Sequence, residues 1–111
     1  MNDKFIHEGL ALGYEAAEAA AEHAGTKWRE TAFDAFIKYA KTHEFFTTED
    51  VRLAYPDIPF PPDTRAWGAI PRQAKKQNII EGTGLVRAND RNVHGRFITQ
   101  WRSKIYQEKN T

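Results

Sequence analysis

The sequence predicts a mainly α-helical domain that ends in a β-hairpin, and three observations indicate this fold class. Apolar side chains recur at helical spacing through most of the chain up to Gln77. Beyond Gln77, two short segments rich in apolar and β-branched residues flank the turn cluster Asn89-Asp90-Arg91-Asn92. With 111 residues, the chain is long enough for one hydrophobic core and too short for a second independent one.

The first element is expected to be a helix over about residues 3–24, which Gly25 ends. We treat residues 1–25 as an N-terminal helical extension of the domain. Its simplest role is to pack on its own domain. The alternative is that it forms a homodimer or binds a partner protein, because Gly9, Gly13 and its many alanines would allow another helix to approach closely.

A second helix is expected from Thr26, its N-cap, to about His43. Its apolar residues recur at i, i+3, i+4 and i+7, which predicts that this helix contributes most to the core. These residues are Trp28, Ala32, Phe33, Phe36, Ile37 and Ala40.

A β-prone segment over 44–47 leads into a third helix, which Thr48 is expected to cap. Thr47 and Asp50 also have the spacing of a capping box. The apolar side of this helix is expected to consist of Val51, Leu53, Ala54 and Tyr55. Four prolines in the segment 56–62 then enforce an extended connection.

The next helix is expected over 64–77, with Asp63 as its N-cap. One side is apolar and consists of Ala66, Trp67, Ile70 and Ala74. The other side carries Gly68 and the cations Arg65, Arg72, Lys75 and Lys76. Because Pro71 cannot donate a backbone hydrogen bond, we predict a kink near Gly68 or a short first turn followed by a helix that restarts at Pro71.

The hairpin is expected to have strands at about 79–86 and 97–101. Its tip carries several cations: Arg87, Arg91, His94 and Arg96. Trp101 is expected to return to the core, and residues 103–111 to form a polar, frayed tail.

Charge is segregated along the chain. Residues 1–63 contain 6 Lys and Arg against 12 Asp and Glu, whereas residues 64–111 contain 10 against 3. The net charge of +1 is therefore the sum of −6 and +7. A basic half that begins at the cationic helix is the electrostatic footprint expected for a polyanionic partner.

Several function classes are not expected. The chain has no cysteine, which excludes disulfides and thiolate metal sites, and its four histidines are scattered, so no metal site or cofactor is predicted. No nucleophile, base and orienting group form a recognisable set, and we do not expect an enzyme. No apolar run approaches the roughly 18 residues of a membrane span, and no signal peptide is recognisable, which predicts a cytoplasmic protein without membrane contact.

The two consecutive basic elements favour DNA binding over an ordinary solvated surface. We expect helix 64–77 to enter the major groove of double-stranded DNA, and the hairpin at about 82–97 to reach phosphates or the minor groove as a wing, in the control of transcription or replication. The nucleic-acid-binding residues expected are Arg65, Arg72, Lys75, Lys76, Arg87, Arg91, His94 and Arg96.

The alternative function belongs to another class, a protein-interaction module that binds and modulates a host or phage protein. The acidic N-terminal region and the apolar segment Ile58-Pro59-Phe60 motivate this alternative.

A resemblance covers roughly the C-terminal half of the chain. It is carried by Phe46-Thr47-Thr48-Glu49-Asp50-Val51, Arg65-Ala66-Trp67-Gly68, Ala74-Lys75-Lys76, and His94-Gly95-Arg96 followed by Trp101. In these motifs the chain resembles small winged helix-turn-helix proteins encoded by bacteriophages and prophages. The resemblance implies a winged helix-turn-helix domain, which we place at 26–102, and an origin in a phage or prophage in a bacterial host cell.

Overall fold

The structure is a computed structural model and describes residues 15–87 and 97–107. A helix over 15–24 opens the described part of the chain. The labelled elements that follow are α2 (Thr26–Thr42), β1 (Phe45–Phe46), α3 (Thr48–Ala54), the 3₁₀-helix η1 (Thr64–Gly68), α4 (Ala69–Lys76), β2 (Ile80–Arg87) and β3 (Phe97–Ser103). The prediction of a helical domain that ends in a hairpin is confirmed, and a three-stranded antiparallel sheet completes the domain.

The strands of the sheet lie in the order β1-β3-β2, and both neighbouring pairs are antiparallel. β1 pairs with the C-terminal part of β3, where Phe46 lies opposite Trp101. β2 and β3 form the hairpin, whose register shifts between Gly82 and Gly84. Gly84 has a φ of 137°, a backbone conformation that favours glycine. Because β1 precedes α3 and β3 ends the domain, the sheet joins segments that are far apart in the sequence.

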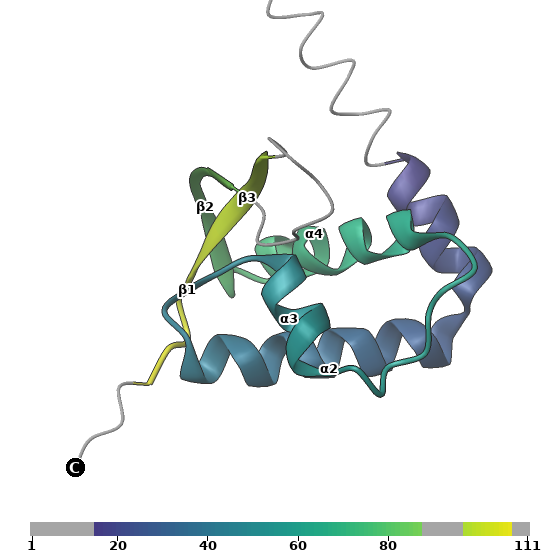
Figure 1. Ribbon diagram of the computed structural model, residues 1–111, viewed down its shortest axis with the longest axis horizontal. Helices are drawn as coiled ribbons and strands as arrows, with labels where there is room; N and C mark the ends of the chain where they lie inside the picture. Colours follow the sequence, from purple (N-terminus) through teal and green to yellow (C-terminus); the bar gives the residue numbers. More distant parts are fainter. Residues whose placement is uncertain (1–14, 88–96, 108–111) are drawn as a thin grey trace, which may run out of the picture.

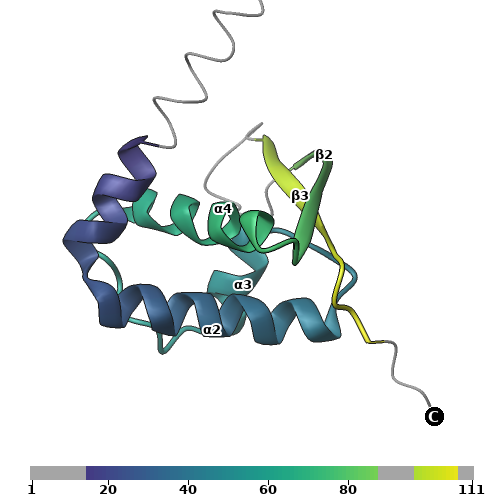
Figure 2. The same cartoon turned by 180° about the vertical axis from the view of Figure 1, so that it is seen from behind.

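The helices and the sheet occupy different parts of the molecule. α2 and α4 run beside each other, and α3 packs on α2 (Figure 1). The sheet lies at one end of these helices and the helix over 15–24 at the other, as both views show (Figures 1 and 2).

The core forms where α2 and α4 face each other and meet the sheet. Its fully buried larger side chains are Phe36, Phe46, Val51, Ile70 and Ile80. The rings of Phe36 and Phe46 meet edge to face at 5.2 Å, and those of Trp28 and Trp67 at 5.3 Å, both favourable geometries for aromatic pairs. Trp101 is half-buried and packs against this core, as predicted.

Two helices begin one residue earlier than predicted. Gly25, with a φ of 98°, occupies the N-cap of α2, so Thr26 already belongs to the helix. Thr47 caps α3 in place of Thr48, and it forms the predicted capping box with Asp50. The Thr47 hydroxyl accepts a bond from the Asp50 amide at 3.1 Å, and the Asp50 carboxylate accepts one from the Thr47 amide at 2.9 Å.

The predicted apolar side of α3 is wrong at two of its four residues. Val51 is fully buried and Tyr55 packs against the core, but Leu53 is 67% exposed and Ala54 is also exposed. Residues two apart on a helix point to different sides, whereas residues four apart share one. Because α3 buries Val51 and its C-cap Tyr55 packs against the core, Leu53 is turned outward.

The segment that contains Pro71 consists of two helical pieces. Asp63 is the N-cap of η1, as predicted, and its carboxylate accepts a bond from the Arg65 amide at 2.9 Å. The α-helical part begins at Ala69, so Pro71 lies in the first turn of α4, where a backbone N–H has no partner inside the α-helix. Of the two predicted forms, the short first turn followed by a restart is confirmed, with the restart two residues before Pro71.

The predicted polar tail does not begin at Ser103. Ser103 is buried as the last residue of β3, and its hydroxyl donates to the Ala40 carbonyl at 2.6 Å. Farther along, the Gln107 amide donates to the Lys41 carbonyl at 3.1 Å. Ser103 and Gln107 are therefore bound to the end of α2, while 108–111 lie outside the described residues.

The helix over 15–24 packs on its own domain. Ala17, Ala20 and Ala21 are buried and belong to the core cluster. The rest of the predicted N-terminal helix, residues 1–14, lies outside the described residues. Within the described parts of the chain, no helix has the length and apolar character needed to cross a membrane.

Replacing the α3 cap tests the contribution of the capping box to stability. Thr47→Ala is expected to lower the free energy of unfolding by about 1–2 kcal/mol, because the Asp50 amide loses its partner at a buried position. Urea unfolding measures this change. Thr31→Ala is the control, since the exposed Thr31 hydroxyl bonds only to the Lys27 carbonyl within α2. Equal losses in both variants would contradict a specific role for the cap.

Candidate functional site

The two sides of α4 have opposite character. Ala69, Ile70, Pro71 and Ala74 are buried, which fixes the rotation of the helix. Lys75 and Lys76 are exposed, and Arg72 is half-exposed beside them. The predicted cationic side of the helix is therefore turned away from the core. Long cationic side chains on one exposed helical face can contact a row of negative charges.

Arg65 is placed differently from the other cations of this segment. It lies in η1, and its guanidinium forms an ion pair with Asp63 at 2.6 Å. The hydrogen bonds from Arg65 lower the pKa of the Asp63 carboxyl, and the same pair raises the pKa of Arg65. Part of the charge of Arg65 is thus compensated within the chain, although its side chain remains 68% exposed.

Arg72 belongs to a cluster that includes the helix over 15–24. The Glu18 carboxylate accepts hydrogen bonds from both terminal nitrogens of Arg29, at 2.9 and 3.4 Å, and lies 3.6 Å from an Arg72 nitrogen. The Arg29 Nε also donates to the Gln73 side chain at 3.0 Å. The hydrogen bonds from Arg29, helped by the charges of Arg72 and Lys76, hold the pKa of Glu18 below its ordinary value of 4.5.

The helix that carries Glu18 comes close to the chain at Gly68, the last residue of η1 and the N-cap of α4. A Cβ atom placed on Gly68 would lie 3.1 Å from the Cβ of Ala17, tighter than most such contacts. Gly68 and the small Ala17 therefore allow the helix over 15–24 to meet the junction of η1 and α4. As a result, Glu18 is held at one edge of the cationic side of α4.

The hairpin contributes one described residue to the predicted set. Arg87 is the last residue of β2 and is exposed. Arg91, His94 and Arg96 lie outside the described residues, so the structure does not place the cations predicted for the hairpin tip. Arg72, Lys75 and Lys76 are the predicted site residues that share the exposed side of α4.

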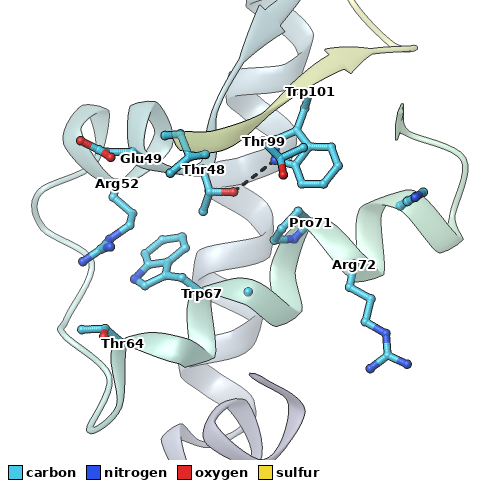
Figure 3. Close-up of a pocket in the computed structure, with 12 residues that line it drawn as sticks. Thr48, Glu49, Arg52, Thr64, Trp67, Pro71, Arg72, Thr99 and Trp101 are labelled. Atoms are coloured by element: carbon cyan, nitrogen blue, oxygen red, sulfur yellow. Dashed lines mark hydrogen bonds between the residues drawn. The ribbon is translucent and has the colours of Figure 1, made fainter. Parts of the chain in front are cut away.

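A groove of about 440 Å³ borders the cationic side of α4. Its walls come from α3, from η1 and α4, and from β3 (Figure 3). Apolar side chains line much of it: Trp67, Pro71, Ile98 and Trp101. The Trp101 indole N–H donates to the Thr48 hydroxyl at 3.3 Å, which joins two of the walls. Its volume lies within the range typical of pockets that bind small molecules.

Arg52 is a residue of the site that was not predicted from the sequence. Arg52 lines the groove together with Arg72 and Lys75, and its guanidinium lies 5.8 Å from the centre of the Trp67 ring, within range of a cation–π contact. Figure 3 shows Arg52 and Arg72 on opposite sides of the groove. No local sequence signal marks Arg52, because its position beside Trp67 depends on how α3 and η1 come together in the folded domain.

Cationic and apolar side chains therefore lie next to one another on this surface, a combination that can hold a negatively charged group beside an apolar one. Among residues 15–87 and 97–107, no group of three His, Cys, Asp or Glu side chains could hold a metal ion. Comparison with known proteins adds no relative: no protein-family model, curated protein or solved structure matches the chain.

The Glu18 cluster predicts a specific pH dependence of stability. Because the pKa of Glu18 is lowered in the folded state, its stabilising contribution is present above about pH 4.5 and is lost as the pH falls through the folded-state pKa. Wild type is expected to exceed Glu18→Gln in free energy of unfolding near pH 7, and this difference should shrink toward pH 3.

Urea unfolding at a series of pH values measures this difference. Glu22→Gln, an exposed position on the same helix, is the matched control and should stay close to wild type. A difference between wild type and Glu18→Gln that stays constant from pH 7 to pH 3 would contradict the ionic role of Glu18.

Proposed function

We propose that this chain is a winged helix-turn-helix protein that binds double-stranded DNA through the exposed side of α4. In this proposal the β2–β3 hairpin is the wing, and the protein acts in the control of transcription or replication in a phage or prophage. The observation that carries the proposal is the two-sided character of α4: its apolar side is buried in the core, and its cations lie on the exposed side. A helix that is fixed to the core by its buried side can enter the major groove of DNA with its exposed side, without a change in its own conformation.

The order of the elements supports the fold named in this proposal. A short strand precedes the helix pair α3 and α4, and a hairpin follows it. The short strand joins the same sheet as the hairpin, in the order β1-β3-β2. The connection from Tyr55 to Asp63 is longer than the turn of a standard helix-turn-helix unit, since it carries the prolines between the two helices.

The charges around α4 support a polyanionic ligand. Arg72, Lys75 and Lys76 lie on its exposed side, and Arg52 on α3 adds a cation across the groove. Arg87, the exposed last residue of β2, adds a cation on the hairpin. Contacts of this kind neutralise phosphates and release condensed counterions, so binding should weaken steeply as salt is added.

Neutralising two cations of α4 tests the proposal. Arg72→Gln/Lys76→Gln is expected to weaken binding to duplex DNA and to reduce the slope of log affinity against log salt by about two, roughly one for each lost phosphate contact. Fluorescence anisotropy with a labelled mixed-sequence duplex at several salt concentrations gives both quantities.

The matched control removes the same charge from another surface. Lys27→Gln/Lys38→Gln changes two exposed lysines of α2 and should leave affinity and slope close to those of wild type. Equal effects of the two double variants would mean that only net charge matters. Unchanged affinity in the α4 variant would show that α4 is not the DNA-contacting element.

Glu18 is expected to oppose DNA binding, because a phosphate that approaches Arg72 meets a carboxylate already 3.6 Å from that side chain. Removing one unfavourable charge at about 4 Å in water corresponds to about 1 kcal/mol. Glu18→Gln should therefore bind duplex DNA up to about fivefold more tightly in the same titration, whereas Glu22→Gln should change affinity little. Weaker binding by Glu18→Gln would indicate instead that Glu18 positions Arg72 for its contact.

A protein partner is the second candidate, and exposed apolar side chains favour it. Phe60 in the proline-rich connection is 85% exposed, and Leu53 on α3 is 67% exposed. Absence of DNA binding at low salt, together with co-purification of one host protein that Phe60→Ser abolishes, would support this candidate over DNA binding.

A further inference from the structure

We propose that the groove between α3, α4 and β3 accepts an unpaired nucleobase, so that the preferred DNA is one that contains a base outside a regular duplex. This inference rests on the proposed DNA binding and names the form of DNA that the site selects. The phosphates of DNA would account for the cationic side of α4, but they would leave the apolar groove beside it without a matching ligand group. A regular duplex offers phosphates and sugars to such a surface and keeps its bases stacked inside the helix.

The lining of the groove matches the flat apolar faces of a base. Two of the three tryptophans of the chain, Trp67 and Trp101, border it together with Pro71 (Figure 3). Trp67 is 6% exposed and forms part of the wall, whereas Trp101 is only half-buried. Aromatic side chains bind unpaired bases by stacking, with little dependence on base identity.

The indole of Trp101 is held in position before any ligand arrives. Its ring N–H is bonded to Thr48, and its ring packs near Gly82, where an added Cβ would lie 3.5 Å from Trp101 Cζ3. A fixed ring loses little conformational freedom on binding, which favours its use as a platform.

Cations stand where the phosphates beside such a base would lie. Arg72 and Lys75 come from α4, and Arg52 comes from α3, where the carboxylate of Glu49 also lines the groove. The net positive charge at the groove therefore lies on the α4 side. Thr48 and Thr99 add hydroxyl groups to the lining, which can bond to the polar edges of a base. Apolar walls with cations at the rim are the combination by which proteins hold a nucleic-acid strand together with one of its bases.

The test compares two DNA duplexes of equal sequence, one of which carries a single additional unpaired base. The full chain is titrated with each, and both anisotropy and tryptophan emission are recorded. Wild type should bind the duplex with the unpaired base about tenfold more tightly, as expected for one stacked base. Of the two duplexes, only this one should quench the tryptophan emission. A labelled single strand serves as a third ligand and should quench the emission as well.

Two variants assign the preference to the groove. Thr99→Glu places a carboxylate at the groove wall on β3 and should remove the tenfold preference and the quenching. Thr83→Glu makes the same change at an exposed residue of β2 that does not line the groove and should retain both. Near-ultraviolet circular dichroism establishes that each variant is folded, and Ile98→Gln replaces Thr99→Glu if that variant is not.

The outcomes separate this inference from the proposed function. Equal, salt-dependent binding of both duplexes without a change in tryptophan emission overturns the inference and leaves DNA binding by α4 standing. Loss of the preference in Thr83→Glu to the same extent as in Thr99→Glu also overturns it. If wild type binds neither duplex nor the single strand at low salt, both proposals fail, and the groove becomes a candidate for a protein partner.

Discussion

The packing of the apolar side of α4 against α2 is the constraint on which the rest of the structure depends. Ile70 and Ala74 on α4, with Phe36 on α2, are fully buried, so α4 has one possible rotation about its axis. That rotation sends Arg72, Lys75 and Lys76 to the other side. Burial of apolar area provides the free energy, and the position of the cations follows from it.

The elements that were predicted correctly are those with strong local signals. The capping box of Thr47 and Asp50, the Asp63 cap and the long apolar stripe of α2 each act within a few residues of the chain. Burial was predicted wrongly where the sequence pattern was short, or where contacts with distant segments of the chain determine which residues are buried. Leu53 lies on a helix of seven residues, too short for its apolar pattern to fix which side is buried. Ser103 is buried because it bonds to Ala40, 63 residues earlier.

The candidate site was predictable only in part for the same reason. Periodicity identified the cationic side of α4, because that side belongs to one helix. The ion pair between Glu18 and Arg72 joins two helices that α2 separates in the sequence, and no local pattern specifies which glutamate meets which arginine. The groove combines α3, α4 and β3, so its lining depends on the tertiary arrangement. Arg52 lies beside Trp67 for the same reason, because the contact joins α3 to η1.

The central claim is that one surface, formed by the exposed side of α4 with α3 and the hairpin beside it, contacts DNA. Mapping of amide chemical shifts by NMR during a titration with duplex DNA tests it most directly. The account predicts that the largest shifts fall on η1 and α4, on α3 from Thr48 to Arg52, and on β2 and β3. Shifts confined to the exposed side of α2 around Lys27 and Lys38, with α4 unaffected, would contradict it.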